Sequence, residues 1–306
     1  MITATRKSKK SFNNFVLFLW ARIRRIYPMY WFATGVQLIL AMSGAIMLFG
    51  AIPFDDLPRH LLLLPPSGRP FLDVGWSLIF EMYFYIVFAL LFFFVPGRLL
   101  YWLAAWIGAV AVISTLLTPA AHWLLQLMFS PFCFTFFCGT LAGMAPVRLG
   151  WNMAVLLSGA ALALTAVLLA LIYLDPGFLA NGTWSRSLAL GICFATLVYG
   201  VVNIEHHNGL WVPTFLIRLG DASYTLYLIH MPLILLVGSI WYAIAPGLFG
   251  LDVLRDSLWD NLFLILVAGL LSVSSTLWLH VHVEQPLLRL SRDPGRLILG
   301  RWRETR

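Results

Sequence analysis

The chain has 306 residues, of which 61% are hydrophobic and 11% are charged, and its formal net charge is +7. A soluble globular domain usually carries about 25% charged residues, so this composition excludes one and indicates a polytopic membrane protein whose solvent is the bilayer. The positive charge by itself would also fit a nucleic-acid-binding protein, but its distribution along the chain argues against that class.

The chain is predicted to open with a basic lead-in over residues 1–28. Its segment SFNNFVLFLWARIRRIYP is typical of an amphipathic helix that lies along the inner membrane surface. No apolar run follows the first charges before Phe15, so these residues do not have the form of a signal peptide.

A transmembrane helix needs about 20 predominantly apolar residues. The stretches that meet this requirement are 29–49, 76–95, 99–117, 123–144, 153–174, 188–204, 222–245 and 261–283. Turns with Pro and Gly separate most of them, and Pro131 and Pro232 are expected to kink the helices that contain them. The predicted fold is an all-α, polytopic integral membrane helical bundle with about eight transmembrane helices.

The basic residues predict the orientation, because cytoplasmic loops are enriched in Lys and Arg. With the N-terminus inside, most of the 20 Lys and Arg residues fall in cytoplasmic segments. The exceptions are Arg59, Arg69, Arg186 and Arg255. Both termini are therefore expected to be cytoplasmic, with a membrane domain at 29–286 and a basic tail at 287–306. The positive charge then lies beside anionic lipid headgroups, and no nucleic-acid partner is expected.

Arg22 and Arg25 are three residues apart, so they share a face on a helix. Guanidinium groups bind phosphate in a bidentate manner. A pair at the cytoplasmic mouth would hold a phosphorylated donor; the alternative is an ordinary basic membrane anchor.

Glu81 lies within the apolar stretch VGWSLIFEMYFY, roughly 9 Å from the start of its helix at 1.5 Å per residue. An acidic residue within a span is costly and usually functional, and a shielded carboxyl suits general acid–base chemistry. The alternative is a structural partner for a buried Arg or Tyr.

In LGDASYTLYLIHMPL, the residues Ser223, Tyr227 and His230 are spaced to share one helix face, with His230 roughly 12 Å deep. A histidine on an apolar helix is alternatively a core residue with its hydrogen bonds satisfied. In HVHVEQP, His280 and Glu284 are four apart and are expected to pair.

Cys133, Cys138 and Cys193 lie in apolar runs without CxxC spacing, so neither a metal site nor a disulfide framework is predicted. Taken alone, these features fit an integral-membrane transferase and a proton-coupled carrier equally well.

The stretches RIRRIYPMYW, VGWSLIFEMYFY, LGDASYTLYLIHMPL and VEQPL, in this order, resemble the membrane acyltransferase 3 family, and in particular its exopolysaccharide-production branch. The resemblance implies a bacterial inner-membrane O-acyltransferase without a bound cofactor. Such an enzyme moves an acyl group, commonly acetyl from acetyl-CoA, to a hydroxyl of a surface polysaccharide or lipid-linked glycan.

The family motifs fall on particular residues of this chain. Arg22 and Arg25 match the motif that suggests donor contact, and Glu81 and His230 match candidate catalytic positions. The remaining matches, expected to shape the pocket, are Trp76, Ser223, Tyr224, Tyr227 and Glu284.

The chain departs from the family pattern at its start. The family normally opens with a helix that carries a histidine thought to act as the general base, and this chain has no histidine before His60. We therefore expect the first two family helices to be absent, through a start assigned too late, a fragment, or a degenerate copy. His230 could stand in as the base; an inactive relative and a carrier remain the alternatives.

Overall fold

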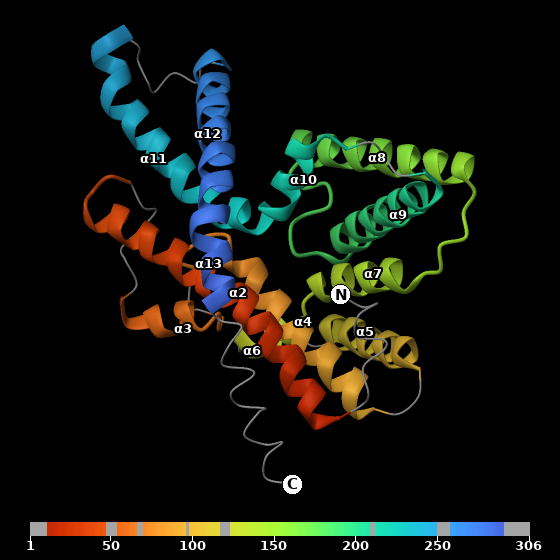
Figure 1. Ribbon diagram of the computed structural model, residues 1–306. Coiled ribbons are helices and arrows are strands. Elements are labelled where there is room, and N and C mark those ends of the chain that lie inside the picture. Colours follow the sequence, from red (N-terminus) through yellow and green to blue (C-terminus); the bar gives the residue numbers. More distant parts are fainter. Residues whose placement is uncertain are drawn as a thin grey trace. The chain divides into compact units, whose positions relative to one another are not determined.

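The computed structural model describes residues 11–46, 54–65, 70–95, 98–116, 123–208, 212–249 and 258–290 (Figure 1). Their secondary structure is helical, and no strand occurs among them, which confirms the predicted all-α fold. The chain divides into two compact units. The first comprises Met1–Leu19 and Phe80–Trp211, and the second comprises Trp20–Ile79 and Val212–Arg306.

Within the described residues, 7 helical segments are long and apolar enough to cross a membrane. They are Gly75–Phe94, Leu99–Leu116, Trp123–Met144, Trp151–Leu174, Trp184–His207, Ser223–Ile244 and Leu262–Leu290. These segments correspond to seven of the predicted spans, and the chain is a multi-pass membrane protein. The span expected over 29–49 is not among them, and residues 47–49 lie outside the described part.

The expected lead-in and the expected first span form one helix, α2 (Phe12–Met42), which continues through Pro28. The first half of this helix carries three arginines, and its second half carries the polar side chains Thr34 and Gln37. Thr34 and Gln37 are both almost fully buried. The orientation of α2 on a membrane and the domain limits at residues 28 and 286 stay predictions.

The first unit contains most of α4 (Gly75–Phe94) and the helices that follow it in the chain. These are α5 (Leu99–Leu116), α6 (Trp123–Met128), α7 (Phe132–Met144), α8 (Trp151–Leu174) and α9 (Trp184–Asn208). Pro131 stands at the start of α7, where the predicted kink is a complete interruption between α6 and α7. Helices α8 and α9 pack side by side (Figure 1). A Cβ atom at Gly200 would lie 2.3 Å from the Ser158 hydroxyl oxygen, so only glycine permits this close approach.

The second unit contains most of α2 and all the helices after residue 212. Its elements include η1 (Phe54–Asp56), α3 (Leu57–Leu61), α10 (Thr214–Asp221), α11 (Ser223–Phe249) and α12 (Leu258–Leu279), followed by the π-helical η2 (His280–Glu284) and α13 (Gln285–Leu290). Helix α11 remains one helix through Pro232. Helices α11 and α12 pack against each other, and η2 continues directly from α12.

A segment between α2 and α4, which we name the strap (residues 57–65 and 70–74), lies along α2. Four α2 side chains donate hydrogen bonds to strap carbonyl oxygens over 2.6–2.8 Å. The bonds join Tyr27 to Leu62, Tyr30 to His60, Trp31 to Leu61 and Gln37 to Phe71. Irregular backbone near hydrocarbon requires such partners for its carbonyl groups. These four side chains of α2 therefore hold the strap.

His60 makes docking of the strap sensitive to pH. Its side chain is buried, and its Nδ1 accepts the backbone N–H of Phe71 at 3.3 Å, so the ring is neutral with its proton on Nε2. Burial lowers the pKa of His60 from its ordinary value of 6.5, and the nearby charge of Asp56, itself paired with Arg59, offsets part of this effect. Because the undocked strap binds the proton more readily, docking is stable above pH 6.5 and weakens as the pH falls through that value.

Hydrogen exchange of the Phe71 amide should test this dependence. Between about pH 7.5 and about pH 5.5, within the range in which histidines titrate, protection of that amide should decrease after correction for intrinsic exchange. The amide of Leu226, bonded to Ala222 within the second unit, serves as the internal reference. Equal protection at both pH values would contradict a role for His60, as would the same loss of protection in His60→Gln.

Candidate functional site

The sequence motifs of the second unit meet at the first turns of α11. The Tyr224 hydroxyl donates to the carbonyl oxygen of Ile26 on α2 at 2.8 Å. The Tyr227 hydroxyl donates to the carbonyl oxygen of Val74 at 2.8 Å and also lies in short contact with the Ser77 hydroxyl. Tyr224 and Tyr227 therefore fix α11 against the segment that contains Ile26 and the segment that contains Val74. Each of these segments carries another of the sequence motifs.

A buried hydrogen-bond network joins α11 to the π-helical turn after α12. The Thr225 hydroxyl donates to Glu284 Oε2 at 2.5 Å, and His280 Nδ1 lies 2.6 Å from the same oxygen. Thr225 and Glu284 are 0% and 4% exposed. The side-chain nitrogen of Gln285 lies 3.2 Å from His280 Nε2. The predicted pair of His280 and Glu284 is thus confirmed, and Thr225 extends it to a second helix.

The π-helical geometry has a role in forming this network. Helices with a π turn carry an inserted residue, and such turns occur often at functional sites. Here the turn begins at His280 and ends at Glu284, and the side chains of these two residues are in contact. A buried carboxylate that accepts two hydrogen bonds is satisfied, whereas an unsatisfied one would be costly.

His230 lies two turns into α11, on the same face as Tyr227. Its Nδ1 is 3.2 Å from the carbonyl oxygen of Leu226, and a carbonyl oxygen only accepts hydrogen bonds. The proton of the neutral ring is therefore on Nδ1, which makes Nε2 the basic nitrogen. The ring centroids of His230 and Tyr227 are 6.0 Å apart.

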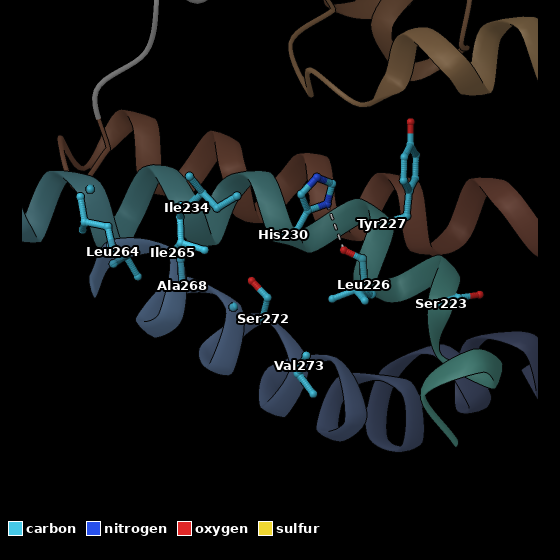
Figure 2. A pocket seen from close by; sticks show the side chains of 13 residues that line it. Ser223, Leu226, Tyr227, His230, Ile234, Leu264, Ile265, Ala268, Ser272 and Val273 are labelled. Atoms are coloured by element: carbon cyan, nitrogen blue, oxygen red, sulfur yellow. Dashed lines mark hydrogen bonds between the residues drawn. The ribbon is translucent and has the colours of Figure 1, made fainter. Parts of the chain in front are cut away.

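A cavity of about 710 Å³ runs between α11 and α12 and includes both of these side chains in its wall (Figure 2). Ser223, Tyr227, His230 and Ser272 supply its polar groups. The rest of its wall consists of Leu226, Ile234, Val237, Gly238, Leu264, Ile265, Ala268, Gly269 and Val273. The cavity has the size of a small-molecule site, with few polar groups in a largely apolar wall.

The predicted donor-binding residues Arg22 and Arg25 lie on α2 in the second unit. Both lie about one helical turn or less before Ile26, whose carbonyl oxygen accepts the hydrogen bond from Tyr224. Arg25 is exposed and Arg22 is half-buried. Trp76, in the first turn of α4, is 44% exposed. The second unit therefore contains eight of the nine predicted site residues, although their roles stay predictions.

Glu81 is the ninth predicted site residue, and it belongs to the first unit. The Tyr85 hydroxyl, one helical turn further along α4, donates a short hydrogen bond to Glu81 Oε1. This contact corresponds to the structural alternative considered from the sequence, in which the carboxylate has a tyrosine partner.

Sequence reasoning missed two residues of this region, Ser77 and Thr225. Both lie inside motifs that we had recognised, and a hydroxyl in an apolar span is a signal that a partner is near. The partners themselves, Tyr227 and Glu284, are 150 and 59 residues away. The three cysteines are free and buried. Within the described segments, no group of three or more His, Cys, Asp and Glu side chains is arranged to hold a metal ion.

Comparison with known families decides what kind of protein carries this arrangement. The family described as "Acyltransferase domain" matches residues 2–281, which is nearly the whole chain. The chain belongs to this acyltransferase family. The resemblance inferred from the four motifs is therefore confirmed, and the protein is a multi-pass membrane acyltransferase.

A curated relative of the acyltransferase is the exopolysaccharide production protein ExoZ of Rhizobium meliloti (strain 1021). The two are 29% identical over 287 residues, which cover 90% of this chain and 82% of the relative. No solved structure matches the acyltransferase.

The arrangement around α11 suits the chemistry of an acyltransferase. Acyl transfer to an alcohol requires a base that removes the hydroxyl proton as the oxygen attacks the acyl carbon. His230 presents a basic nitrogen beside the cavity. The ring of Tyr227, whose hydroxyl is fixed by Val74, has its centroid 6.0 Å from that of the His230 ring. Bonds from Tyr224, Thr225 and Tyr227 hold the helix that carries this nitrogen, which favours a fixed geometry at the site.

Proposed function

We propose that the acyltransferase moves an acetyl group from acetyl-CoA to a hydroxyl of a surface polysaccharide or lipid-linked glycan at a bacterial inner membrane. The observation that carries the proposal is the convergence of three family motifs on the start of α11, beside a cavity with a basic histidine nitrogen. The similarity to an exopolysaccharide production protein supports a glycan as the acceptor.

In this proposal Arg22 and Arg25 hold the phosphates of CoA at the cytoplasmic side. Two cations on one face of α2 provide charge and bidentate geometry for phosphate oxygens. This role requires the pair to lie on the cytoplasmic side, which is the side that the enrichment of Lys and Arg predicts for it.

The chemical step is the attack of a glycan hydroxyl on the thioester carbon. His230 Nε2 accepts the hydroxyl proton as the new C–O bond forms, and the tetrahedral intermediate then loses the CoA sulfur as the C–S bond breaks. The proton on the imidazole returns to the CoA thiolate, so the products are the glycan ester and CoA thiol. The low dielectric of the site would strengthen hydrogen bonds to the oxyanion.

The proposal is tested with the full-length chain reconstituted in lipid nanodiscs. Purified protein, radiolabelled acetyl-CoA and a panel of glycan acceptors should give a covalently labelled glycan that depends on both protein and thioester. A proton-coupled carrier would give solute flux across vesicles without a labelled covalent product. Absence of label on every acceptor, with correctly inserted protein, would contradict the proposed reaction.

Glu81→Gln should remove most of the transfer activity while insertion and expression stay unchanged. The amide keeps the volume and can still accept the Tyr85 hydrogen bond, but it cannot carry the negative charge or accept a proton. Steady-state transfer rates and the amount of monodisperse protein should be measured together. Glu205→Gln, at an exposed position of α9, is the matched control.

Tyr85→Phe separates the two roles considered for Glu81. If Glu81 only anchors Tyr85, both Glu81→Gln and Tyr85→Phe should retain activity. Tyr85→Phe removes the bond and should lower thermal stability by a small amount, whereas Glu81→Gln keeps an acceptor and should lower it less. A fully active Glu81→Gln protein would remove Glu81 from the reaction.

A further inference from the structure

The lining of the cavity between α11 and α12 is almost wholly apolar, and the polar residues Ser223, Tyr227 and His230 gather toward one end of it. The two helices run antiparallel there, with Ser223, Tyr227 and Leu226 at one end and Ile234, Leu264 and Ile265 at the other (Figure 2). Ser272 on α12 lies between the two ends, next to Ala268 (Figure 2). A ligand that matches this wall has a hydroxylated head and an aliphatic extension.

The length of the cavity suits a hydrocarbon chain. Its wall follows α11 from Ser223 to Gly238, which is roughly 22 Å at 1.5 Å of rise per residue. The apolar part from His230 to Gly238 is roughly 12 Å long on the same basis. An acetyl group extends over only two carbon atoms and would leave nearly all of this length unfilled.

The direction of the cavity also suits a membrane lipid. It runs along α11 and α12, and both helices belong to candidate membrane spans. A chain bound parallel to a span keeps the direction of a lipid tail, so a lipid-linked molecule could enter without leaving the hydrocarbon layer. Its head would then lie beside the basic nitrogen of His230.

Small residues keep the apolar end open. Gly238 on α11 and Gly269 on α12 both line the cavity, and a Cβ atom at either would meet nothing within 4 Å. Ala268 and Ser272 add two further small side chains to the α12 wall. The open volume therefore depends on residues that larger side chains could replace without a backbone clash.

We propose that this cavity holds the hydrocarbon chain of a lipid-linked glycan acceptor and presents a hydroxyl of its head group to His230. This proposal rests on the proposed function and narrows its two acceptor classes to the lipid-linked one. Because lipid tails are as apolar as the cavity wall, the bilayer competes for the chain. The cavity therefore acts on the acceptor by positioning it.

The variants Gly238→Leu and Gly269→Leu test the proposal by filling the apolar end. Leucine has a higher helix propensity than glycine, and neither new Cβ meets a neighbour, so both proteins should fold. Gly159→Leu on α8 is the matched control, because Gly159 is exposed on a membrane helix and its Cβ would also meet nothing within 4 Å.

Each full-length protein in nanodiscs receives acetyl-CoA and two acceptors with the same glycan head. One acceptor carries a long polyprenyl or alkyl chain, and the other is free in water. The leucine variants should lose about tenfold or more of their transfer rate to the chain-linked acceptor, because displacement of a reacting group by about 1 Å already costs up to 10²-fold. Transfer to the free glycan should stay within twofold of the wild-type rate, and Gly159→Leu should match wild type on both acceptors.

Equal rates of the wild type and both leucine variants on the chain-linked acceptor would overturn the proposal, even though the acyltransferase activity stands. Loss of transfer to both acceptors in equal proportion would also overturn it, since the effect would not depend on the chain.

A second measurement does not depend on activity. A glycan with a diazirine-bearing alkyl chain should label peptides of α11 and α12, and excess chain-linked glycan should prevent the labelling. If the wild type transfers acetyl to neither acceptor, the proposed function fails, and this labelling still decides the occupant of the cavity. Labelling that an alkyl chain without a head group produces equally well would assign the cavity to ordinary bilayer lipid and overturn the proposal.

Discussion

Glu284→Ala is expected to be the most destabilising single substitution in the second unit. Glu284 accepts bonds from both Thr225 and His280 and is 4% exposed. Its removal leaves the Thr225 hydroxyl and the His280 N–H without a partner, and each buried donor left unsatisfied costs roughly 1–3 kcal/mol. We therefore expect the free energy of unfolding to fall by about 2–6 kcal/mol.

Unfolding by titration with a denaturing detergent should measure this loss. Thr225→Val and Glu284→Gln complete the comparison. The valine variant removes one donor and keeps the side-chain shape, whereas glutamine keeps an acceptor oxygen. The double variant Glu284→Ala/Thr225→Val should be less destabilised than the sum of the single effects, because both remove the same bond. Additive losses would show that the two side chains do not interact.

His230→Ala is expected to have the largest effect on activity, a fall of about 10²–10⁴-fold in the transfer rate, the range typical of removing a general base. The fold should be unaffected. The His230 ring bonds only to the carbonyl of Leu226 in its own helix among the hydrogen bonds that the structure gives it. Michaelis constants for the donor and acceptor should change less than the rate constant, because the base acts mainly in the transition state.

His282→Ala provides a closely matched control. The Nδ1 of His282 lies 2.9 Å from the carbonyl oxygen of Trp278, four residues earlier in the chain, which is the same local contact that His230 makes. Its side chain is exposed. Full activity in His282→Ala and a large loss in His230→Ala would assign the effect to the position of the ring. Comparable activity in both variants would exclude His230 as the base.

The sequence sufficed to predict seven membrane-spanning segments, because the signal for a span is local. A run of apolar side chains must lie in hydrocarbon whatever its neighbours are, and its backbone must then be helical. The span expected over 29–49 stays a prediction, and its local signal is mixed for the opposite reason. The polar side chains of α2 have their partners in the strap, up to 35 residues away along the chain.

The same distinction applies to the candidate site. The pair of His280 and Glu284 could be predicted because residues four apart on a helix are neighbours, and the structure has that contact. Glu81 and Tyr85 have the same spacing, and this local signal was overlooked. The bonds from Tyr224 to Ile26 and from Thr225 to Glu284 join residues 198 and 59 positions apart. No local pattern specifies contacts of that kind, since they depend on how the helices of the second unit pack.

The four hydrogen bonds that hold the strap join side chains of α2 to main-chain atoms of the strap. Helix α2 supplies side chains, whereas the strap supplies only main-chain oxygens of His60, Leu61, Leu62 and Phe71. Every amino acid carries such an oxygen, so these four bonds depend on the path of the strap and not on the identity of those residues. Among related chains, substitutions should accumulate at the exposed strap positions Leu62 and Leu64 more readily than at the α2 residues that donate these bonds. The surface of the strap can thus diversify during evolution while its attachment is retained.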